Sequence, residues 1–525
     1  MNRTLLNKVS CLLISSCLPK LFWGEALLTA AYLINRSPSV PLNDQIDNQQ
    51  GKENNIEENQ QGNPSELVTD QNPSTHTYQL ARDRERRIPR IPSKLKDFHL
   101  ALNTENIEPS SYEEALKSSK SDKWKIAMEE EINSLMKNKT WTLVPKPKDT
   151  SIVDCKWLFK IKQETESTRY KARLVAKGFT QKEGIDFTEI FSPVVKYTTV
   201  RIILALTAHF NWELKQMDVK TAFLHGDLDE TIYMSQPDGF ISDKHPDHVC
   251  LLKKSLYGLK QSPRQWNKKF DMFMQSLRFQ RSAFDPCLYF KYYSDIPVFL
   301  VLYVDDMLIA SSSMTLILEL QNNLSKNFEM KDLGDAKKIL GMSIERNRKS
   351  STIFLNQKSY VKNVVEKFSM SNAKTTSVPL AAHFQLCKNQ SPNSETEKEQ
   401  MKNIPYSNAI GSVMYLMVST RPDIAYAVSC LSRFMSNAGM PHWEALKWLL
   451  RYLNGSMDIG ILFSKLSDDV KLVGYVDSIY ANDKDSRRST TSYMFTLCGA
   501  CISWKSQLQN IVALSTTEAE YIATT

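Results

Sequence analysis

The stretch that decides the fold is Phe299-Leu-Val-Leu-Tyr-Val-Asp-Asp-Met-Leu-Ile-Ala310, in which Asp305 and Asp306 interrupt a run of apolar residues. Carboxylates are costly to bury unless they are paired or bind a metal ion. The pattern therefore predicts two apolar strands joined by a turn that carries both aspartates. An Asp pair is also a common turn signal, and this stretch alone favours an ordinary turn over a metal site.

A third carboxylate changes that balance. Asp218 lies in Trp212-Glu-Leu-Lys-Gln-Met-Asp-Val-Lys-Thr-Ala-Phe-Leu-His-Gly226, at the end of a strand-like segment and before a helical start. Three acids at strand ends can converge on two divalent cations, and Mg²⁺ prefers a few carboxylate oxygens completed by water and phosphate. Two such ions can activate an attacking hydroxyl and stabilise the leaving oxygen of a phosphoryl displacement.

The composition of the chain limits the classes of protein to which it can belong. The 525 residues suggest about three or four domains. An apolar fraction of 42% excludes a wholly disordered chain, and the net charge of +8 is compatible with nucleic acid without establishing it. Nine cysteines are too few for a disulfide scaffold and favour a reducing compartment. Runs of about 18 apolar residues do not occur, so no transmembrane helix is predicted.

The chain changes character along its length. Residues 1–42 are predicted to form two short helices and a loop. Residues 43–108 are predicted to be a disordered linker, because the first part is rich in Asn and Gln and contains no aromatic residue. From residue 109 onward helical and strand patterns are mixed, and no internal repeat is visible. Helical spacing is predicted over residues 112–137, and residues 155–162 and 170–177 are predicted to be strands. The expected fold class is α+β.

Four segments carry a family resemblance. The chain resembles the Pol polyprotein of Copia-type LTR retrotransposons, and the four motifs follow that family's order and spacing. They are Tyr170-Lys-Ala-Arg-Leu-Val-Ala-Lys-Gly178, Gln216-Met-Asp-Val-Lys-Thr-Ala-Phe223, Ser255-Leu-Tyr-Gly-Leu-Lys-Gln-Ser-Pro263 and Leu302-Tyr-Val-Asp-Asp306.

The resemblance implies a reverse transcriptase with a right-hand polymerase fold. It places fingers, palm and thumb in residues 109–375, a connection region in 376–469 and a truncated RNase H-like α/β domain in 470–525. The implied activity is RNA-directed DNA polymerisation on an RNA template with a DNA primer and dNTPs. Mg²⁺ or Mn²⁺ would be the cofactor. The catalytic and metal-binding residues would be Asp218, Asp305 and Asp306, with the backbone carbonyl of Val219 as an extra ligand.

The same resemblance implies a nucleotide-binding set. Lys171 and Arg173 match residues that hold the incoming triphosphate, although a solvated strand edge is the ordinary interpretation of such a pair. Phe223 matches a steric gate that excludes a ribose 2′-hydroxyl, and core packing is its alternative. Three further residues match the motif that shapes the nucleotide pocket, and a turn before a helix is compatible with that role: Gly258, Lys260 and Ser262.

The two ends resemble neighbouring Pol domains. Residues 470–525 resemble the beginning of RNase H, with Asp477 and Glu520 as a partial site and Glu518 as a weaker alternate. Ile479 stands where the family usually has another Asp, and the later acids are absent. Residues 1–42 resemble the end of an integrase core without its acids. RNase H and integrase activities are therefore not expected.

A second hypothesis belongs to another class. The chain could be a catalytically inactive retrotransposon remnant that at most binds nucleic acid. The family resemblance implies a cytoplasmic location in a virus-like particle, with a nuclear location as the alternative, and no membrane partner. The oligomeric state is left open by the sequence.

Overall fold

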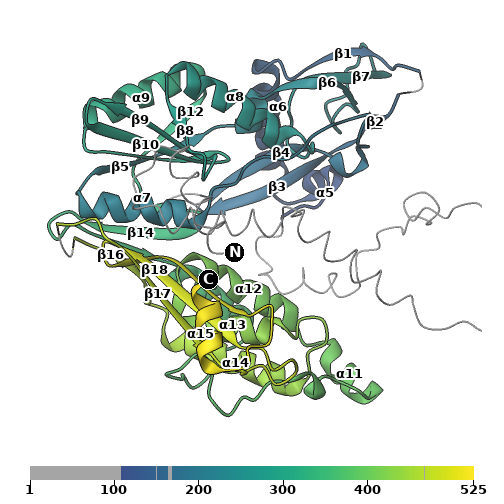
Figure 1. Ribbon diagram of the computed structural model, residues 1–525. Coiled ribbons are helices and arrows are strands. Elements are labelled where there is room, and N and C mark those ends of the chain that lie inside the picture. Colours follow the sequence, from purple (N-terminus) through teal and green to yellow (C-terminus); the bar gives the residue numbers. More distant parts are fainter. Residues whose placement is uncertain (1–107, 149, 164–167, 466–467) are drawn as a thin grey trace, which may run out of the picture. The chain divides into compact units, whose positions relative to one another are not determined.

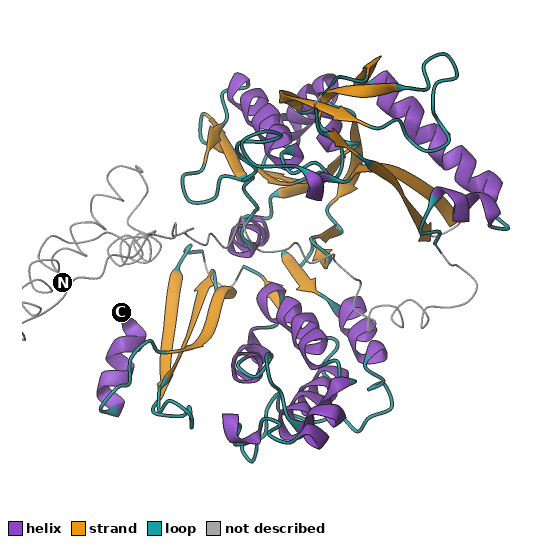
Figure 2. Ribbon diagram, turned by 90° about the vertical axis from the view of Figure 1, so that its right-hand side faces the viewer, coloured by secondary structure: helices purple, strands orange, loops and turns teal. Residues whose placement is uncertain are grey.

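The computed structural model describes residues 108–148, 150–163, 168–465 and 468–525. The predictions for residues 1–42 and for the linker up to residue 107 lie outside this range. Glu108–Thr525 forms one compact unit of mixed helices and strands, which confirms the α+β class (Figures 1 and 2). Within the described part of the chain, every helix is too short or too polar to cross a membrane.

The first part of this unit combines two helices, a two-stranded ribbon and a small sheet. Helix α6 presents an apolar face to the β3–β4 ribbon, where the Trp124 ring contacts Phe159 and Tyr170 at centroid distances of 5.1 and 4.8 Å. The small sheet has the order β1-β7-β6-β2. The bounds are α5 (Tyr112–Lys117), α6 (Ser121–Lys137), β1 (Trp141–Pro145), β2 (Ile152–Val153), β3 (Cys155–Gln163), β4 (Thr168–Ala176), β6 (Asp227–Met234) and β7 (His248–Lys254).

The central element is a six-stranded sheet with the order β12-β5-β11-β10-β9-β8. Residues of helices α8 and α9 share one apolar cluster with this sheet, and residues of α7 share a second cluster with it. The bounds are α7 (Tyr197–His209), β5 (Glu213–Val219), α8 (Ser262–Ser276), β8 (Gln280–Arg281), β9 (Leu288–Tyr293), β10 (Ile296–Tyr303), β11 (Asp306–Ser311), α9 (Met314–Asn327) and β12 (Met330–Asp335).

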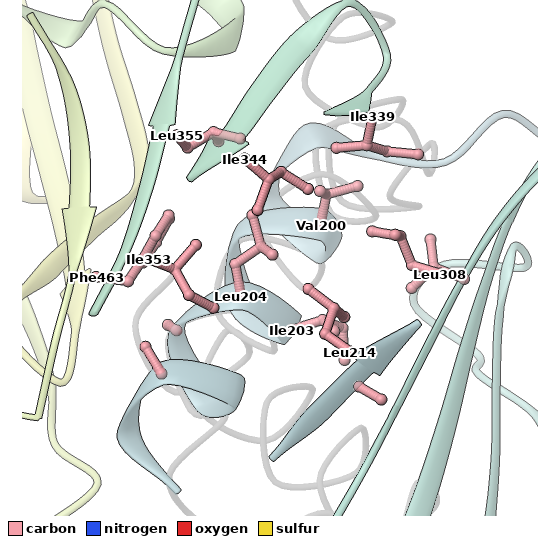
Figure 3. Packing of buried hydrophobic residues seen from close by; sticks show 14 of the residues in the cluster. Val200, Ile203, Leu204, Leu214, Leu308, Ile339, Ile344, Ile353, Leu355 and Phe463 are labelled. Atoms are coloured by element: carbon pink, nitrogen blue, oxygen red, sulfur yellow. The ribbon is translucent and has the colours of Figure 1, made fainter. Parts of the chain in front are cut away.

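Helix α7 is buried between this sheet and a smaller one. Figure 3 shows Val200, Ile203 and Leu204 of α7 among side chains of both sheets. The smaller sheet has the order β13-β14-β15-β16. Because α7 leads directly into β5, its packing fixes the strand that carries Asp218. The bounds are β13 (Lys338–Ile339), β14 (Met342–Asn347), β15 (Thr352–Asn356) and β16 (Gly460–Phe463).

The remaining residues form a helical cluster and a three-stranded sheet. The helices pack around buried aliphatic residues, and the sheet has the order β17-β18-β19 with α15 after it (Figure 1). The bounds are α10 (Lys358–Lys367), α11 (Glu395–Lys402), α12 (Tyr406–Ser419), α13 (Ala425–Ser432), α14 (Met440–Gly455), β17 (Leu472–Ile479), β18 (Thr490–Leu497), β19 (Ala500–Leu508) and α15 (Thr516–Thr524). Short 3₁₀ turns are η3 (Gly178–Thr180), η4 (Ala222–His225), η5 (Lys388–Gln390) and η6 (Pro422–Ile424).

Candidate active site

Three aspartates meet at one end of the central sheet. Strands β10 and β11 form the predicted hairpin, with Tyr303 paired to Asp306 and a two-residue turn between them. Asp305 lies in this turn, and Asp306 is the first residue of β11. On the other side of β11, Asp306 is the register partner of Asp218 on β5. Antiparallel pairing therefore brings together carboxylates that are far apart in the sequence.

The acids influence one another electrostatically. The pKa of Asp306 is raised to about 6, first by burial and then by the negative charges of Asp305 and Asp218, while a hydrogen bond from Gln216 opposes the shift. Like charges at short range disfavour ionisation of each other. This cluster of acids therefore concentrates negative charge at one place.

This negative charge raises the question of whether the acids could hold a metal ion. Among the described residues, no three His, Cys, Asp or Glu side chains are arranged closely enough to hold a metal ion. The donor chemistry fits nonetheless, because hard divalent cations prefer carboxylate oxygens and would relieve the repulsion that raises the Asp306 pKa. Val219 lies next in β5, and its N–H donates to the Asp305 carbonyl at 2.9 Å. Its own carbonyl as a metal ligand stays a prediction.

The β3–β4 ribbon presents one apolar and one basic face. Ala172, Leu174 and Ala176 are buried, and the alternate residues Lys171 and Arg173 are half-buried on the other face. The two cations therefore lie on the same side of one strand. The guanidinium of Arg173 lies 4.8 Å from the centroid of the Tyr257 ring, in cation–π geometry.

A buried acid supports this strand from α6. The Glu131 carboxylate accepts a hydrogen bond from the Leu174 N–H at 3.3 Å. Burial raises its pKa, while that hydrogen bond and the charges of Lys171 and Arg173 act in the opposite direction. Glu131 therefore lies close enough to both cations to affect their electrostatic environment, a role that no motif in the sequence indicated.

Phe223 lies on η4 and contacts Tyr257, an aromatic residue for which no role was predicted. The rings of Phe223 and Tyr257 are 5.1 Å apart in an edge-to-face arrangement. Burial raises the pKa of Tyr257 to about 12, and Arg173, Asp305 and Asp218 all act on it electrostatically. Tyr257 thus lies between the basic strand, Phe223 and the acids. Its position within the Ser255–Pro263 motif is the feature of the sequence that could have indicated this role for Tyr257.

Gly258 is required by a close backbone approach. It adopts φ +93°, and a Cβ at this position would lie 2.1 Å from the carbonyl oxygen of Ala176. The carbonyl of Tyr257 also accepts a hydrogen bond from the Ala176 N–H at 2.7 Å. A side chain at residue 258 would therefore push this loop away from the end of β4.

The other two predicted pocket residues engage the protein itself. The Lys260 ammonium donates to the Gln181 carbonyl at 3.1 Å and lies 4.5 Å from the centroid of the Phe187 ring. The Ser262 hydroxyl donates to the Leu256 carbonyl at 2.6 Å and is buried. Both residues therefore stabilise the turn before α8, which agrees with the turn before a helix that was expected from the sequence. Direct contact of either residue with a nucleotide stays a prediction.

The partial RNase H pair lies elsewhere, on the β17–β19 sheet. Asp477 is exposed and lines a cavity of about 260 Å³ with Tyr475, Ser492 and Trp504. Glu520 on α15 accepts a hydrogen bond from the Ser478 N–H at 3.3 Å. Ser492 is the register partner of Asp477, whereas α15 is linked through Gln509 to Thr491. Glu520 therefore lies next to the peptide group that joins Asp477 and Ser478.

The amino-acid sequence is similar to those of known proteins. Residues 138–382 match the family model described as reverse transcriptase (RNA-dependent DNA polymerase). The chain is 52% identical over 441 residues to a retrovirus-related Pol polyprotein from transposon TNT 1-94 of Nicotiana tabacum, covering 83% of this chain and 33% of that protein. It is 40% identical over 410 residues to the corresponding polyprotein from transposon RE1 of Arabidopsis thaliana, covering 78% of this chain and 27% of that protein.

A shorter relative is covered almost completely. The chain is 34% identical over 308 residues to a putative transposon Ty5-1 protein of Saccharomyces cerevisiae, covering 58% of this chain and 97% of that protein. A telomerase structure from Candida albicans shares 11% identity at a TM-score of 0.22, covering 63% of this chain and 66% of that one, a likeness too low to bear on the fold. This chain spans about a third of the first Pol polyprotein and about a quarter of the second. The chain belongs to the reverse transcriptase family of Copia-type retrotransposon Pol polyproteins.

Proposed function

We propose that the chain is an RNA-directed DNA polymerase of a Copia-type retrotransposon. The observation that carries this proposal is the register that sets Asp306 opposite Asp218, with Asp305 in the adjoining turn. In this proposal residues 109–375 serve as fingers, palm and thumb. Residues 376–469 serve as the connection and residues 470–525 as an RNase H-like domain.

The reaction would be nucleotidyl transfer. The primer 3′-hydroxyl oxygen forms a bond to the α-phosphorus of a dNTP, the bond to the pyrophosphate oxygen breaks, and the hydroxyl proton is released. Asp218, Asp305 and Asp306 would hold Mg²⁺ or Mn²⁺, with the Val219 carbonyl as an added ligand. Bound divalent ions would supply positive charge for the attacking and leaving oxygens.

The remaining residues would bind and select the nucleotide. Lys171 and Arg173 present positive charge on one face of β4, which suits a triphosphate. Phe223, backed by Tyr257, would fill the space that a ribose 2′-hydroxyl needs. Gly258 would keep the loop close to β4, and Lys260 and Ser262 would hold its shape through the hydrogen bonds described above.

Partners follow from the reaction. RNA template and DNA primer would bind mainly through backbone phosphates, so binding should weaken as salt is raised. The proposed location is cytoplasmic, in a particle, with a nuclear phase as the alternative. RNase H activity is not part of the proposal, because Ile479 stands where the family usually has another Asp.

Primer extension on an RNA template tests the proposal, with the wild type beside Asp305→Asn. The matched control is Asp295→Asn, which changes an exposed aspartate in the neighbouring β9–β10 turn. Extension that is abolished only by Asp305→Asn would support a polymerase. The alternative is a catalytically inactive protein that at most binds nucleic acid. Folded wild-type protein that binds primer–template and extends nothing would establish it.

A further inference from the structure

Trp266 is buried on α8 beside the turn that carries the aspartates. Its indole Nε1–H donates a hydrogen bond to the carbonyl oxygen of Val304 at 2.6 Å. From the other side of the turn, the Val219 N–H donates to the carbonyl of Asp305 at 2.9 Å. Two different segments therefore hold the two successive carbonyl groups of the turn.

The turn needs such support. Val304 adopts φ +55°, in the left-handed region that β-branched residues rarely occupy. Its side chain is 37% exposed, so packing alone does not hold it there. Strained backbone persists where the surrounding structure fixes it, and such residues cluster at functional sites. The Trp266 indole fixes the carbonyl of the strained residue directly before Asp305.

Trp266 itself is held rigidly. Its ring lies 5.5 Å from the Phe270 ring and 5.2 Å from the Phe328 ring, measured between centroids. It also lies 5.9 Å from the ring of His225, the last residue of η4. A Cβ at Gly226 would lie 2.9 Å from the backbone nitrogen of Trp266, so the end of η4 packs on the α8 backbone. Trp266 thus joins the aspartate turn to the element that carries Phe223.

We propose that Trp266 is a positioning residue for nucleotidyl transfer. Its indole N–H fixes the Val304–Asp305 turn, so that the carboxylates of Asp305 and Asp306 are held toward Asp218. This inference rests on the proposed polymerase function. It assigns to Trp266 no contact with substrate or metal, only the orientation of the groups that would make such contacts.

The test replaces Trp266 by phenylalanine, which keeps an aromatic ring and removes the N–H donor. The matched control is Trp157→Phe. Trp157 is equally buried, and its Nε1–H donates to the Asp238 carbonyl at 3.0 Å. It is the register partner of Leu174, on the apolar face of the ribbon away from Arg173. Both variants lose one buried hydrogen bond, but only Trp266→Phe loosens the aspartate turn.

Three quantities would be measured for the wild type and both variants. They are the urea midpoint of unfolding, the affinity for Mn²⁺ alone by electron paramagnetic resonance of the free ion, and kcat and KM for dNTP in primer extension. Trp266→Phe is expected to lower kcat by about 10- to 100-fold with KM changed less than about twofold, because small misplacements of reacting groups cost this much. Its Mn²⁺ affinity should fall, while Trp157→Phe should lower only the urea midpoint.

Wild-type kcat and Mn²⁺ affinity in folded Trp266→Phe would overturn the proposal. A wild type that binds Mn²⁺ but extends no primer would instead refute the polymerase function, and the Mn²⁺ comparison would still test Trp266. If Trp266→Phe does not fold, the Val304→Gly background supplies the test, because glycine adopts a positive φ without strain. The double variant should then bind Mn²⁺ more weakly than Val304→Gly. Equal affinities would also overturn the proposal.

Discussion

Asp306 lies directly opposite Asp218 on the neighbouring antiparallel strand. The next pair along the ladder is Met307 with Met217, and both methionines are buried. A shift of one residue would move the apolar side chains of a strand to the opposite face of the sheet. Met217 and Val219 of β5 share one apolar cluster with Met307, and this packing sets the alignment of the two carboxylates.

Asp306→Asn should remove activity without unfolding the protein. Because Asp305, Asp218 and burial raise the Asp306 pKa, a neutral amide there relieves repulsion, and the urea midpoint at pH 8 should stay equal or rise. Primer extension should fall by at least about 10³-fold, since several kcal/mol of transition-state stabilisation would be lost. Asp295→Asn should keep activity. A clearly lower midpoint for Asp306→Asn, or retained extension, would contradict this assignment.

Phe223→Ala should relax the choice between deoxyribonucleotides and ribonucleotides. Removing the ring would open the space beside Tyr257, and the ratio of kcat/KM for dNTP over rNTP should fall by about 10- to 100-fold. Single-nucleotide incorporation with dGTP and GTP measures this ratio. Phe290→Ala, a change on β9, is the control and should leave the ratio unchanged. An unchanged ratio for Phe223→Ala would assign Phe223 to core packing.

Arg173→Ala should weaken nucleotide binding more than chemistry. The charge and the stacking on Tyr257 are both lost, so KM for dNTP should rise by about tenfold. Arg173→Lys keeps the charge without the planar guanidinium and should be intermediate. Arg169→Ala, at an exposed position of the same strand, serves as the control for net charge. If the Arg169 and Arg173 variants raise KM equally, the effect is general electrostatics and not a specific contact.

Arg201→Met should destabilise the whole folded unit. Arg201 is buried on α7, and its guanidinium donates to the carbonyls of Val418, Ser419 and Ile502. It also stacks on Trp504, with 3.8 Å to the ring centroid. Methionine keeps much of the volume and leaves the carbonyls without a donor, so the free energy of unfolding should fall by about 3 kcal/mol.

The measurement is urea unfolding at pH 7.5, with exposed Arg169→Ala expected within about 0.5 kcal/mol of wild type. Arg201→Lys should be nearly as unstable as Arg201→Met, because one ammonium cannot reach the carbonyls of both α12 and β19. A midpoint equal to that of the wild type would show that these carbonyls find water instead.

His442 should make stability depend on pH. Its Nδ1 accepts from the Gly439 N–H at 2.9 Å and its Nε2 contacts the Cys387 carbonyl at 3.2 Å, a pattern that needs the neutral ring. Burial lowers the pKa of His442 below its ordinary value. Below pH of about 6.5 the unfolded chain takes up this proton first, so His442 should reduce stability as pH falls toward 5.5. The contribution should be constant above pH 7.5.

The difference in urea midpoint between wild type and His442→Gln, followed from pH 8 to 5.5, isolates this residue. The wild-type advantage should shrink as pH falls. A difference that does not change with pH would mean that His442 keeps its ordinary pKa in the folded protein.

The local pattern of the sequence predicted much of the fold. Apolar runs on both sides of Asp305-Asp306 gave the β10–β11 hairpin, and the strands near residues 155–162 and 170–177 were also correct to within a residue or two. The helical pattern of residues 112–137 is correct as well, but the structure divides it into α5 and α6. Lys120 precedes α6 without a side-chain capping bond, a boundary that apolar spacing does not show.

The sequence by itself determined the residue types of the site and the family, because four spaced motifs and an alternating strand pattern are local properties. Only the tertiary structure decided which partners those residues meet. Tyr257 beside Phe223, Trp266 on the Val304 carbonyl and Glu520 on the Ser478 N–H depend on strand register and on helix packing. These relationships join segments far apart in the chain, and local periodicity carries no information about them.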